Sequence, residues 1–243
     1  MGFNVKNTTR RKLFEIICPH YCMVCGEIGE IICERCKIDN SCDEMTSCLN
    51  CGLVVKNGHC DVCTLPFVRG FAVGKREGVL EKIVEEYKYK SVRALYLPIA
   101  EMLDATLPCL PAETVVVPMP TVARHVRMRG FDHTWLVAKE LARRRGWKCE
   151  RLVMRVKDSV QMGADRATRR KQAAEAYGLN PKASSRNFGR RGIKLRELAL
   201  GLSETPFLVV DDVWTTGASM KAVCGLLEKA GAKDIAAVVL ARS

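Results

Sequence analysis

Eight of the chain's 13 cysteines stand in four Cys-x-x-Cys pairs near the N-terminus. The pairs are Cys22/Cys25, Cys33/Cys36, Cys48/Cys51 and Cys60/Cys63. A two-residue gap lets both thiolates of a pair bind one metal ion, and two pairs complete a tetrahedral zinc centre with Zn–S bonds of about 2.3 Å. A disulfide framework is the alternative, but disulfides are typical of exported proteins and we find no export signal. The pattern therefore predicts about two zinc ions in a zinc-ribbon-like module over residues 18–66.

The sequence leaves open which pairs share a metal ion. Sequential pairing joins the first pair with the second and the third with the fourth, and it closes the shortest loops; a crossed arrangement is the alternative. Cys18 and Cys42 stand outside the pairs as spare thiols or substitute ligands. His59 adjoins a complete cysteine set and is expected to bind no metal. The remaining cysteines lie among apolar residues and are expected to fill the core; they are Cys109, Cys149 and Cys224.

A second group of reactive side chains follows the continuous apolar run 207–210. Asp211 and Asp212 come directly after this run, where a buried parallel strand presents its carboxyl end to ligands. The chain then continues into a predicted helix through small and hydroxyl-bearing residues, namely Thr215, Thr216, Gly217, Ala218 and Ser219. Backbone N–H groups at such a helix start bind phosphate, while carboxylates accept hydrogen bonds from sugar hydroxyls. The segment therefore predicts a site for a ribose and its 5′-phosphate; a plain turn with solvated aspartates is the alternative.

The surrounding hydrophobic pattern predicts a domain of alternating strands and helices over residues 67–243. Short apolar runs predict strands at 67–73, 114–117, 151–155, 207–210 and 235–240. Apolar residues at helical spacing predict helices at 77–89, 92–106, 133–145 and 218–230. Asp132 is placed to cap the third of these helices, and Gly146 is placed to end it. Strand, helix and strand in succession favour an α/β fold with a parallel sheet.

Composition limits the class of protein and of partner. Hydrophobic residues make up 48% of the 243 residues, enough for one substantial core and a small additional module. No apolar stretch is long enough to cross a membrane, so we expect a cytoplasmic protein. The formal net charge of +12 favours a nucleic acid or a phosphorylated small molecule as partner, and a generally basic surface is the alternative.

One stretch, 182–196, is basic throughout and contains no acidic residue. Its charged residues are Lys182, Arg186, Arg190, Arg191, Lys194 and Arg196. This composition predicts a mobile insertion, over 182–206, that binds a polyanion backbone such as single-stranded DNA. Phe188 is its only aromatic residue up to 196, so readout of bases is not expected. An insertion without a role is the alternative.

Taken together, these motifs resemble the ComF family (ComFC/GntX-like proteins), in which a zinc ribbon precedes a type I phosphoribosyltransferase-like domain. The segment around Asp211 resembles the phosphoribosyl pyrophosphate motif of those transferases. Further matching segments are Tyr87-Lys88-Tyr89-Lys90, Val117-Pro118-Met119-Pro120, Arg129-Gly130-Phe131-Asp132 and the spaced set Arg155, Gln161, Arg166 and Arg169. The chain departs from the family at Asp132 and Gln172, where asparagine is usual, and at Trp214, where a smaller aliphatic residue is common.

The resemblance implies a phosphoribosyl ligand, held with Mg²⁺, and a role in natural competence. Such proteins assist the uptake of single-stranded DNA alongside a helicase. The implied site has Asp211 and Asp212 as catalytic carboxylates, and its pyrophosphate candidates are Pro118, Met119, Pro120 and Arg129. Arg155, Lys157, Arg166 and Arg169 are expected either to close over the pyrophosphate or to form a solvated basic face. Two alternatives remain: a working phosphoribosyltransferase acting on an unidentified base or amine, and a ligand-responsive regulator without chemistry.

Overall fold

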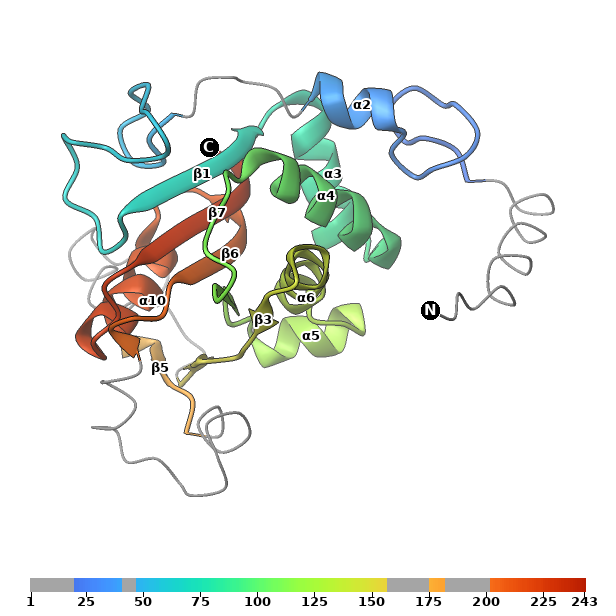
Figure 1. The fold of residues 1–243 in the computed structure, drawn as a ribbon. Helices are drawn as coiled ribbons and strands as arrows, with labels where there is room; N and C mark the ends of the chain where they lie inside the picture. Colours follow the sequence, from blue (N-terminus) through green and yellow to red (C-terminus); the bar gives the residue numbers. More distant parts are fainter. Residues whose placement is uncertain (1–19, 41–46, 157–174, 182–201) are drawn as a thin grey trace, which may run out of the picture.

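A five-stranded parallel sheet forms the centre of the protein (Figure 1). The computed structural model describes residues 20–40, 47–156, 175–181 and 202–243. The strands follow the order β1-β7-β6-β2-β3. Their bounds are β1 Arg69–Lys75, β2 Val115–Pro118, β3 Lys148–Cys149, β6 Phe207–Trp214 and β7 Ile235–Arg242. The α/β fold with a parallel sheet, predicted from the alternating pattern, is confirmed.

Strands β6 and β7 carry apolar residues on both faces, which is why their sequences are continuous hydrophobic runs. In β6, Leu208 and Val210 point to one face of the sheet while Phe207 and Val209 point to the other. Successive strand residues alternate between faces, so a strand covered on both sides needs apolar residues at every position. The register pairs β6 with β2 on one side and with β7 on the other.

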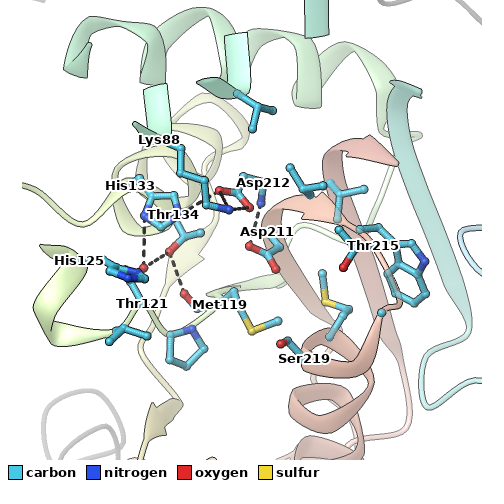
Figure 2. Close-up of a pocket in the computed structure, with 18 of the residues that line it drawn as sticks. Lys88, Met119, Thr121, His125, His133, Thr134, Asp211, Asp212, Thr215 and Ser219 are labelled. Carbon is cyan, nitrogen blue, oxygen red and sulfur yellow. Dashed lines mark hydrogen bonds and ion pairs between the residues drawn. The ribbon is translucent and has the colours of Figure 1, made fainter. Parts of the chain in front are cut away.

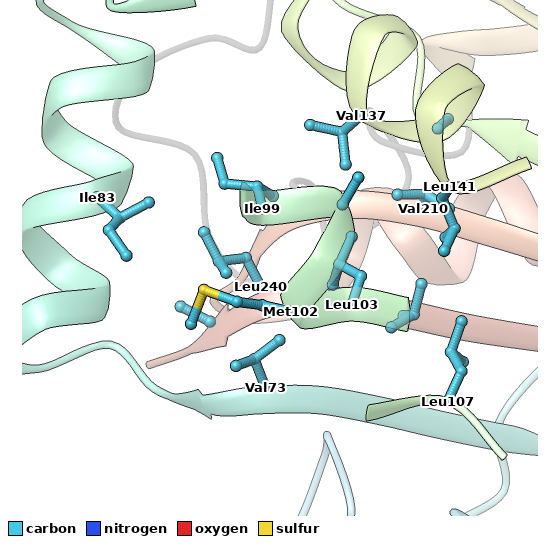
Figure 3. Close-up of a cluster of buried hydrophobic side chains, with 14 of the residues drawn as sticks. Val73, Ile83, Ile99, Met102, Leu103, Leu107, Val137, Leu141, Val210 and Leu240 are labelled. Atoms are coloured by element: carbon cyan, nitrogen blue, oxygen red, sulfur yellow. The ribbon is translucent and has the colours of Figure 1, made fainter. Parts of the chain in front are cut away.

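Helices cover both faces of the sheet. On one face lie α3 Gly78–Lys88, α4 Tyr96–Thr106 and α6 His133–Arg145, while α10 Ala218–Lys229 lies on the other (Figure 1). Figure 3 shows the first of these interfaces, where Ile83, Ile99 and Leu141 of the three helices surround Val210 and Leu240 of the sheet. The helix predicted at 92–106 begins as a 3₁₀ turn, η1 Arg93–Leu95, which is followed directly by α4.

Both predicted ends of α6 are confirmed. The Asp132 side chain accepts a hydrogen bond from the backbone N–H of Trp135 at 3.3 Å, which satisfies one free donor of the first turn. Gly146 follows the last turn with a φ of 70°, a conformation that favours glycine.

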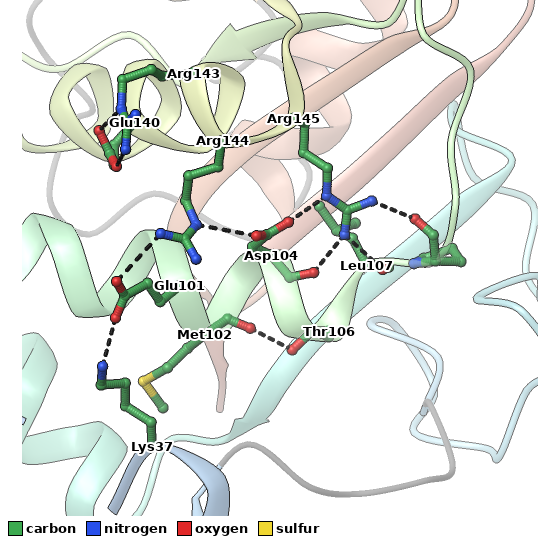
Figure 4. Close-up of polar contacts among 11 residues, drawn as sticks. Lys37, Glu101, Met102, Asp104, Thr106, Leu107, Glu140, Arg143, Arg144 and Arg145 are labelled. Carbon is green, nitrogen blue, oxygen red and sulfur yellow. Dashed lines mark hydrogen bonds and ion pairs between the residues drawn. The ribbon is translucent and has the colours of Figure 1, made fainter. Parts of the chain in front are cut away.

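The basic last turn of α6 is fixed by carboxylates rather than left free (Figure 4). Arg144 pairs with Asp104 at 3.1 Å and Glu101 at 3.3 Å, and Arg145 pairs with Asp104 as well. Glu101 also accepts a hydrogen bond at 2.6 Å from Lys37. Lys37 lies on α2 Glu34–Asp39, in the first cysteine module, which is the segment that holds Cys22 to Cys36. Ion pairs therefore join that module to α4 and α6.

The strand predicted at 151–155 differs from the observed arrangement. β3 ends at Cys149, and the chain then leaves the main sheet. The guanidinium of Arg151 stacks over Trp135 of α6 at 4.3 Å and pairs with Asp132, the residue before α6, at 3.0 Å. β4 Val153–Arg155 instead pairs antiparallel with β5 Tyr177–Leu179 in a separate two-stranded sheet.

A short helix that the pattern does not predict, α5 Ala123–Arg129, follows the loop after β2. None of its residues is buried, so it has no apolar stripe that would reveal it in the sequence. β6 also runs four residues beyond the predicted end at 210, through both aspartates to Trp214.

Both cysteine modules pack onto the sheet domain. Cys22, Ile32 and Cys36 of the first module belong to the same buried cluster as Phe71 of β1, and Leu49 of the second packs with Phe67 on the opposite side. Several predicted features lie outside the described residues: Cys18, Cys42, Lys157, Gln161, Arg166, Arg169, Gln172 and the basic run 182–196. Across the described helices, none combines the length and the apolar character needed to span a membrane.

Candidate functional site

The structure groups the eight paired cysteines into two sets in sequential order. Cys22, Cys25, Cys33 and Cys36 form the first, and Cys48, Cys51, Cys60 and Cys63 form the second, with the four sulfurs of each set within 4.8 Å of one another. The crossed arrangement is therefore not what the structure contains.

The spacing of the sulfurs fits zinc. Four sulfurs at about 2.3 Å from a tetrahedral ion lie about 3.8 Å apart. The sulfurs of Cys25 and Cys33 are 3.6 Å apart, and those of Cys51 and Cys60 are 3.7 Å apart. A disulfide would bring the two sulfurs to about 2.05 Å. Two Cys₄ clusters of this size suit two zinc ions.

At one cysteine of each set, backbone N–H groups favour the thiolate, the form that binds metal. Burial alone would raise the pKa of Cys22, but N–H groups of Cys25 and Cys33 outweigh it and lower the pKa to about 6. In the second set, the N–H groups around Val62 likewise outweigh burial and lower the pKa of Cys60 to about 7.

The structure also describes His59 and three cysteines that lie outside the two sets. His59 is not among the four grouped cysteines of the second set, and its Nδ1 lies 2.9 Å from the carbonyl oxygen of Val68. Cys224 is buried as predicted, and Cys149 is partly buried. Cys109 is exposed, so its assignment to the core is wrong; it lies in the connection between α4 and β2, close to Pro108 and Pro111.

A cavity of about 350 Å³ opens at the carboxyl edge of the parallel sheet (Figure 2). Asp211 and Asp212 line its centre. The 215–219 segment lines one side, where Figure 2 shows Thr215 and Ser219, and the loop after β2 lines the other, where it shows Met119 and Thr121. The volume is within the range of small-molecule sites, and the carboxyl edge is where open α/β sheets bind ligands.

The two adjacent aspartates have different surroundings. Asp212 is bound by Lys88, whose Nζ lies 3.0 Å from Oδ1, and by His133, whose Nε2 lies 3.0 Å from Oδ2. Burial alone would raise the pKa of Asp212, but the His133 hydrogen bond and the Lys88 charge outweigh it and hold the pKa below its usual value. For Asp211, burial and the neighbouring charge of Asp212 raise the pKa to about 8. Asp212 is therefore held in ion pairs, while Asp211 forms none within the described part of the chain.

The protonation of His133 follows from its partners. Arg129 Nη1 lies 2.9 Å from His133 Nδ1, and arginine can only donate, so Nδ1 accepts and carries no proton. The ring proton is then on Nε2, where it is donated to Asp212. Arg129 also donates from Nε to the carbonyl of Lys88 at 2.6 Å. Arg129, His133, Asp212 and Lys88 thus form one continuous network.

Three of the four pyrophosphate candidates line the cavity. Met119, Pro120 and Arg129 line it, but Pro118 does not, because it is the buried last residue of β2. The backbone N–H of Met119 already donates to the carbonyl of Val210 at 2.9 Å. Arg155, from the region expected to close over the pyrophosphate, stacks over Tyr177 at 5.4 Å.

The turn at Gly217 is shaped by Trp214. Gly217 has a φ of 69°, and a Cβ at this position would lie 2.1 Å from the indole ring. Trp214 is 3% exposed and packs perpendicular to Phe67, with the ring centroids 5.9 Å apart. The ammonium of Lys221 lies over the Trp214 ring at 5.4 Å. The bulky residue that departs from the family pattern therefore forms the floor of the turn. The N–H of Ala218 lies 3.4 Å from Thr216 Oγ1, and the next N–H groups of α10 lack intrahelical acceptors, so they are available to an anion.

Comparison with protein families agrees with this geometry. Residues 137–243 match the family described as "Phosphoribosyl transferase domain". The matched stretch contains β6, the 215–219 segment, α10 and β7, and β1 and β2 complete the same sheet. No curated protein matches the chain. The chain thus contains a phosphoribosyltransferase-like domain and, before it, a module with two cysteine clusters suited to zinc.

Sequence reasoning missed the roles of Lys88 and His133. Lys88 occurs in a segment quoted for its resemblance, and His133 is only the first residue of a predicted helix. Both residues are identified by their contact with Asp212. Lys88 and Asp212 are 124 positions apart in the sequence, so this contact is visible only in three dimensions.

Proposed function

We propose that this chain is a ComF-type protein that binds phosphoribosyl pyrophosphate or a related phosphoribosyl ligand. The observation that carries the proposal is the cavity at the sheet edge, where Asp211 lies between the 215–219 segment and the loop after β2. In this arrangement the ribose hydroxyls donate to Asp211, and the 5′-phosphate accepts from Thr216 and the first N–H groups of α10. The pyrophosphate lies toward Met119, Pro120 and Thr121.

The ligand is proposed to bind with Mg²⁺, which prefers carboxylate and phosphate oxygens and keeps several of its waters. Asp211 is the carboxylate available to such an ion, directly or through water, because Asp212 is occupied by Lys88 and His133. The ion would neutralise charge on the pyrophosphate.

Calorimetry with phosphoribosyl pyrophosphate and Mg²⁺ tests the proposal. The wild-type protein should bind, and Asp211→Asn and Thr216→Val should each bind about tenfold or more weakly, because each loses a hydrogen bond to a charged group. Equal affinities in all three proteins would reject the ligand assignment.

The alternative function is a catalytically active phosphoribosyltransferase. In that reaction a base or amine forms a bond to C1 of the ribose as the C1–oxygen bond to pyrophosphate breaks. The chain would contribute by orienting the ligand and by placing charge beside the separating groups. Release of pyrophosphate on adding a panel of nucleobases and amines would favour this alternative, while tight binding without release would favour a binding role.

We further propose a cytoplasmic role in DNA uptake, with single-stranded DNA and a competence helicase as partners. The support is the net charge of +12, the acid-free run 182–196 and the resemblance to the ComF family.

A further inference from the structure

The positively charged residues that line the cavity differ in how many of their donors already bind other groups of the protein. The lysine and arginine residues there are Arg76, Lys88 and Arg129. Lys88 is neutralised by Asp212, and two nitrogens of Arg129 are engaged by Lys88 and His133. These two cations maintain the network around Asp212, and only the Arg129 donors that this network does not use remain for an anion.

Arg76 has no such partner. No ion pair joins its guanidinium to a carboxylate within the described part of the chain, and its Nε is buried without a hydrogen-bond acceptor there. A buried donor left without an acceptor destabilises the protein. An anionic ligand in the cavity would supply the missing acceptor.

The backbone of Arg76 is well fixed. It is the first residue after β1, and its N–H donates to the carbonyl of Arg242 on β7 at 2.7 Å. The side chain therefore starts from the same carboxyl edge of the sheet as Asp211.

The strand order determines from which side Arg76 approaches. β7 and β1 lie on one side of β6, and β2 with its following loop lies on the other. Arg76 is thus on the flank opposite Met119 and Thr121, and the ribbon of β1 passes on the Thr215 side in Figure 2. In a phosphoribosyl ligand the C1 pyrophosphate and the 5′-phosphate are at opposite ends, so the end facing Arg76 is the 5′-phosphate.

We propose that Arg76 binds the 5′-phosphate end of the ligand, together with the 215–219 segment. This inference rests on the proposed phosphoribosyl site and adds a residue outside the 137–243 stretch that matches the transferase family. Its planar guanidinium can donate two parallel hydrogen bonds to one phosphate, whereas the loop supplies single N–H and hydroxyl donors.

Affinities for ribose 5-phosphate and for inorganic pyrophosphate, measured separately on the full-length protein, test the proposal. Arg76→Met should weaken ribose 5-phosphate binding about tenfold to a hundredfold and leave pyrophosphate binding unchanged. Arg76→Lys should give an intermediate loss, because it keeps the charge but not the fork. Lys75→Gln is the matched control: it removes one positive charge from an exposed neighbouring residue that does not line the cavity, and it should bind like the wild type.

A stability measurement separates binding from a structural role. Arg76→Met removes the unsatisfied Nε, so the unliganded variant should melt at the same temperature as the wild type or higher. A lower melting temperature together with equal weakening of both ligands would overturn the proposal. So would unchanged binding of ribose 5-phosphate, or a loss confined to pyrophosphate. If the wild-type protein binds neither compound nor phosphoribosyl pyrophosphate, the proposed function fails and this inference fails with it.

Discussion

The ammonium group of Lys88 lies 3.0 Å from Oδ1 and 2.9 Å from Oδ2 of Asp212. Lys88 ends α3 and Asp212 lies on the central strand, so this pair joins a helix to the edge of the sheet. His133 on α6 completes the contact to Asp212 from a second helix. The pair therefore supports the shape of the cavity, and in the proposed site it leaves Asp211 as the carboxyl group that faces the ligand.

Replacing the two aspartates should have different consequences. Asp212→Asn leaves Lys88 without its counter-ion and should lower the free energy of unfolding by about 3–5 kcal/mol. Asp211→Asn removes no ion pair and should leave stability nearly unchanged while weakening phosphoribosyl binding about tenfold or more. Denaturant unfolding and calorimetry on both variants measure this contrast. Equal destabilisation by the two substitutions would contradict it.

Ligand binding should depend on pH through Asp211. Its pKa of about 8 means that the carboxyl group is mostly protonated at pH 7, whereas ribose hydroxyls and Mg²⁺ require the carboxylate. Affinity for ribose 5-phosphate should therefore rise between pH 7 and 8 and level off above the pKa. Phosphate groups titrate near pH 6, so they add little in this range. Asp211→Asn should show a flat profile over the same range, and a rising profile in that variant would assign the dependence to another group.

Gly217→Ala should disrupt the turn before α10. The substitution places a Cβ 2.1 Å from the Trp214 ring and puts alanine at a φ of 69°. The indole must move, and affinity for phosphoribosyl ligands should fall about tenfold or more. Gly146→Ala provides a control of equal backbone strain, because it also has a positive φ but nothing lies within 4 Å of its Cβ. Similar binding by both variants would show that the Trp214 contact is unimportant.

Metal analysis should find about two zinc ions per chain. Cys60→Ser should lose one of them, and Cys109→Ser, an exposed cysteine outside both sets, should lose none. Because Leu49 packs against the sheet domain, zinc removal should also lower the melting temperature of the whole protein. Intact zinc content in Cys60→Ser would reject the assignment of the second set.

Binding to single-stranded DNA should weaken steeply with salt if the run 182–196 contacts the phosphate backbone. Each neutralised phosphate contributes about 0.7 log units of affinity per log unit of salt. Replacing Arg190, Arg191 and Lys194 by glutamine should flatten the slope by roughly two units, equally for different sequences. Zinc content and ribose 5-phosphate binding serve as controls for folding. An unchanged slope would exclude the run as the contact surface.

Features with a local cause could be predicted from the sequence. The strand of β6 is predictable because burial on both faces requires an unbroken apolar run, and the Asp132 cap and Gly146 terminus are predictable because they act within one turn. The cysteine pairs are predictable as metal ligands because the two-residue spacing within each pair suits one metal ion. The 215–219 segment could be located, but the role of Trp214 beneath it could not, because its contact with Phe67 joins distant parts of the chain.

The division of labour between Asp211 and Asp212 could not be predicted. Neighbouring residues on a strand point to opposite sides, and what lies on each side depends on helices that are remote in sequence. On an amphipathic helix such as α3, Lys88 reads as an ordinary residue of the polar face. Arg76 is similar, because its proposed role comes from the lack of an acidic partner among the described residues, which sequence alone does not reveal.

The order of strands in the sheet also determines when the cavity can exist during synthesis. Both cysteine sets are complete once Cys63 has emerged from the ribosome, and they require only metal to close. Among the described strands, in contrast, β1 has β7 as its one partner, and β2 gains its β6 neighbour only after Phe207 is made. For most of translation, apolar strands are therefore exposed without their partners, a state prone to aggregation. The protein should depend on chaperones until its last two strands are released, and a ribosome stalled before β6 would hold metal-loaded modules attached to an unfolded domain.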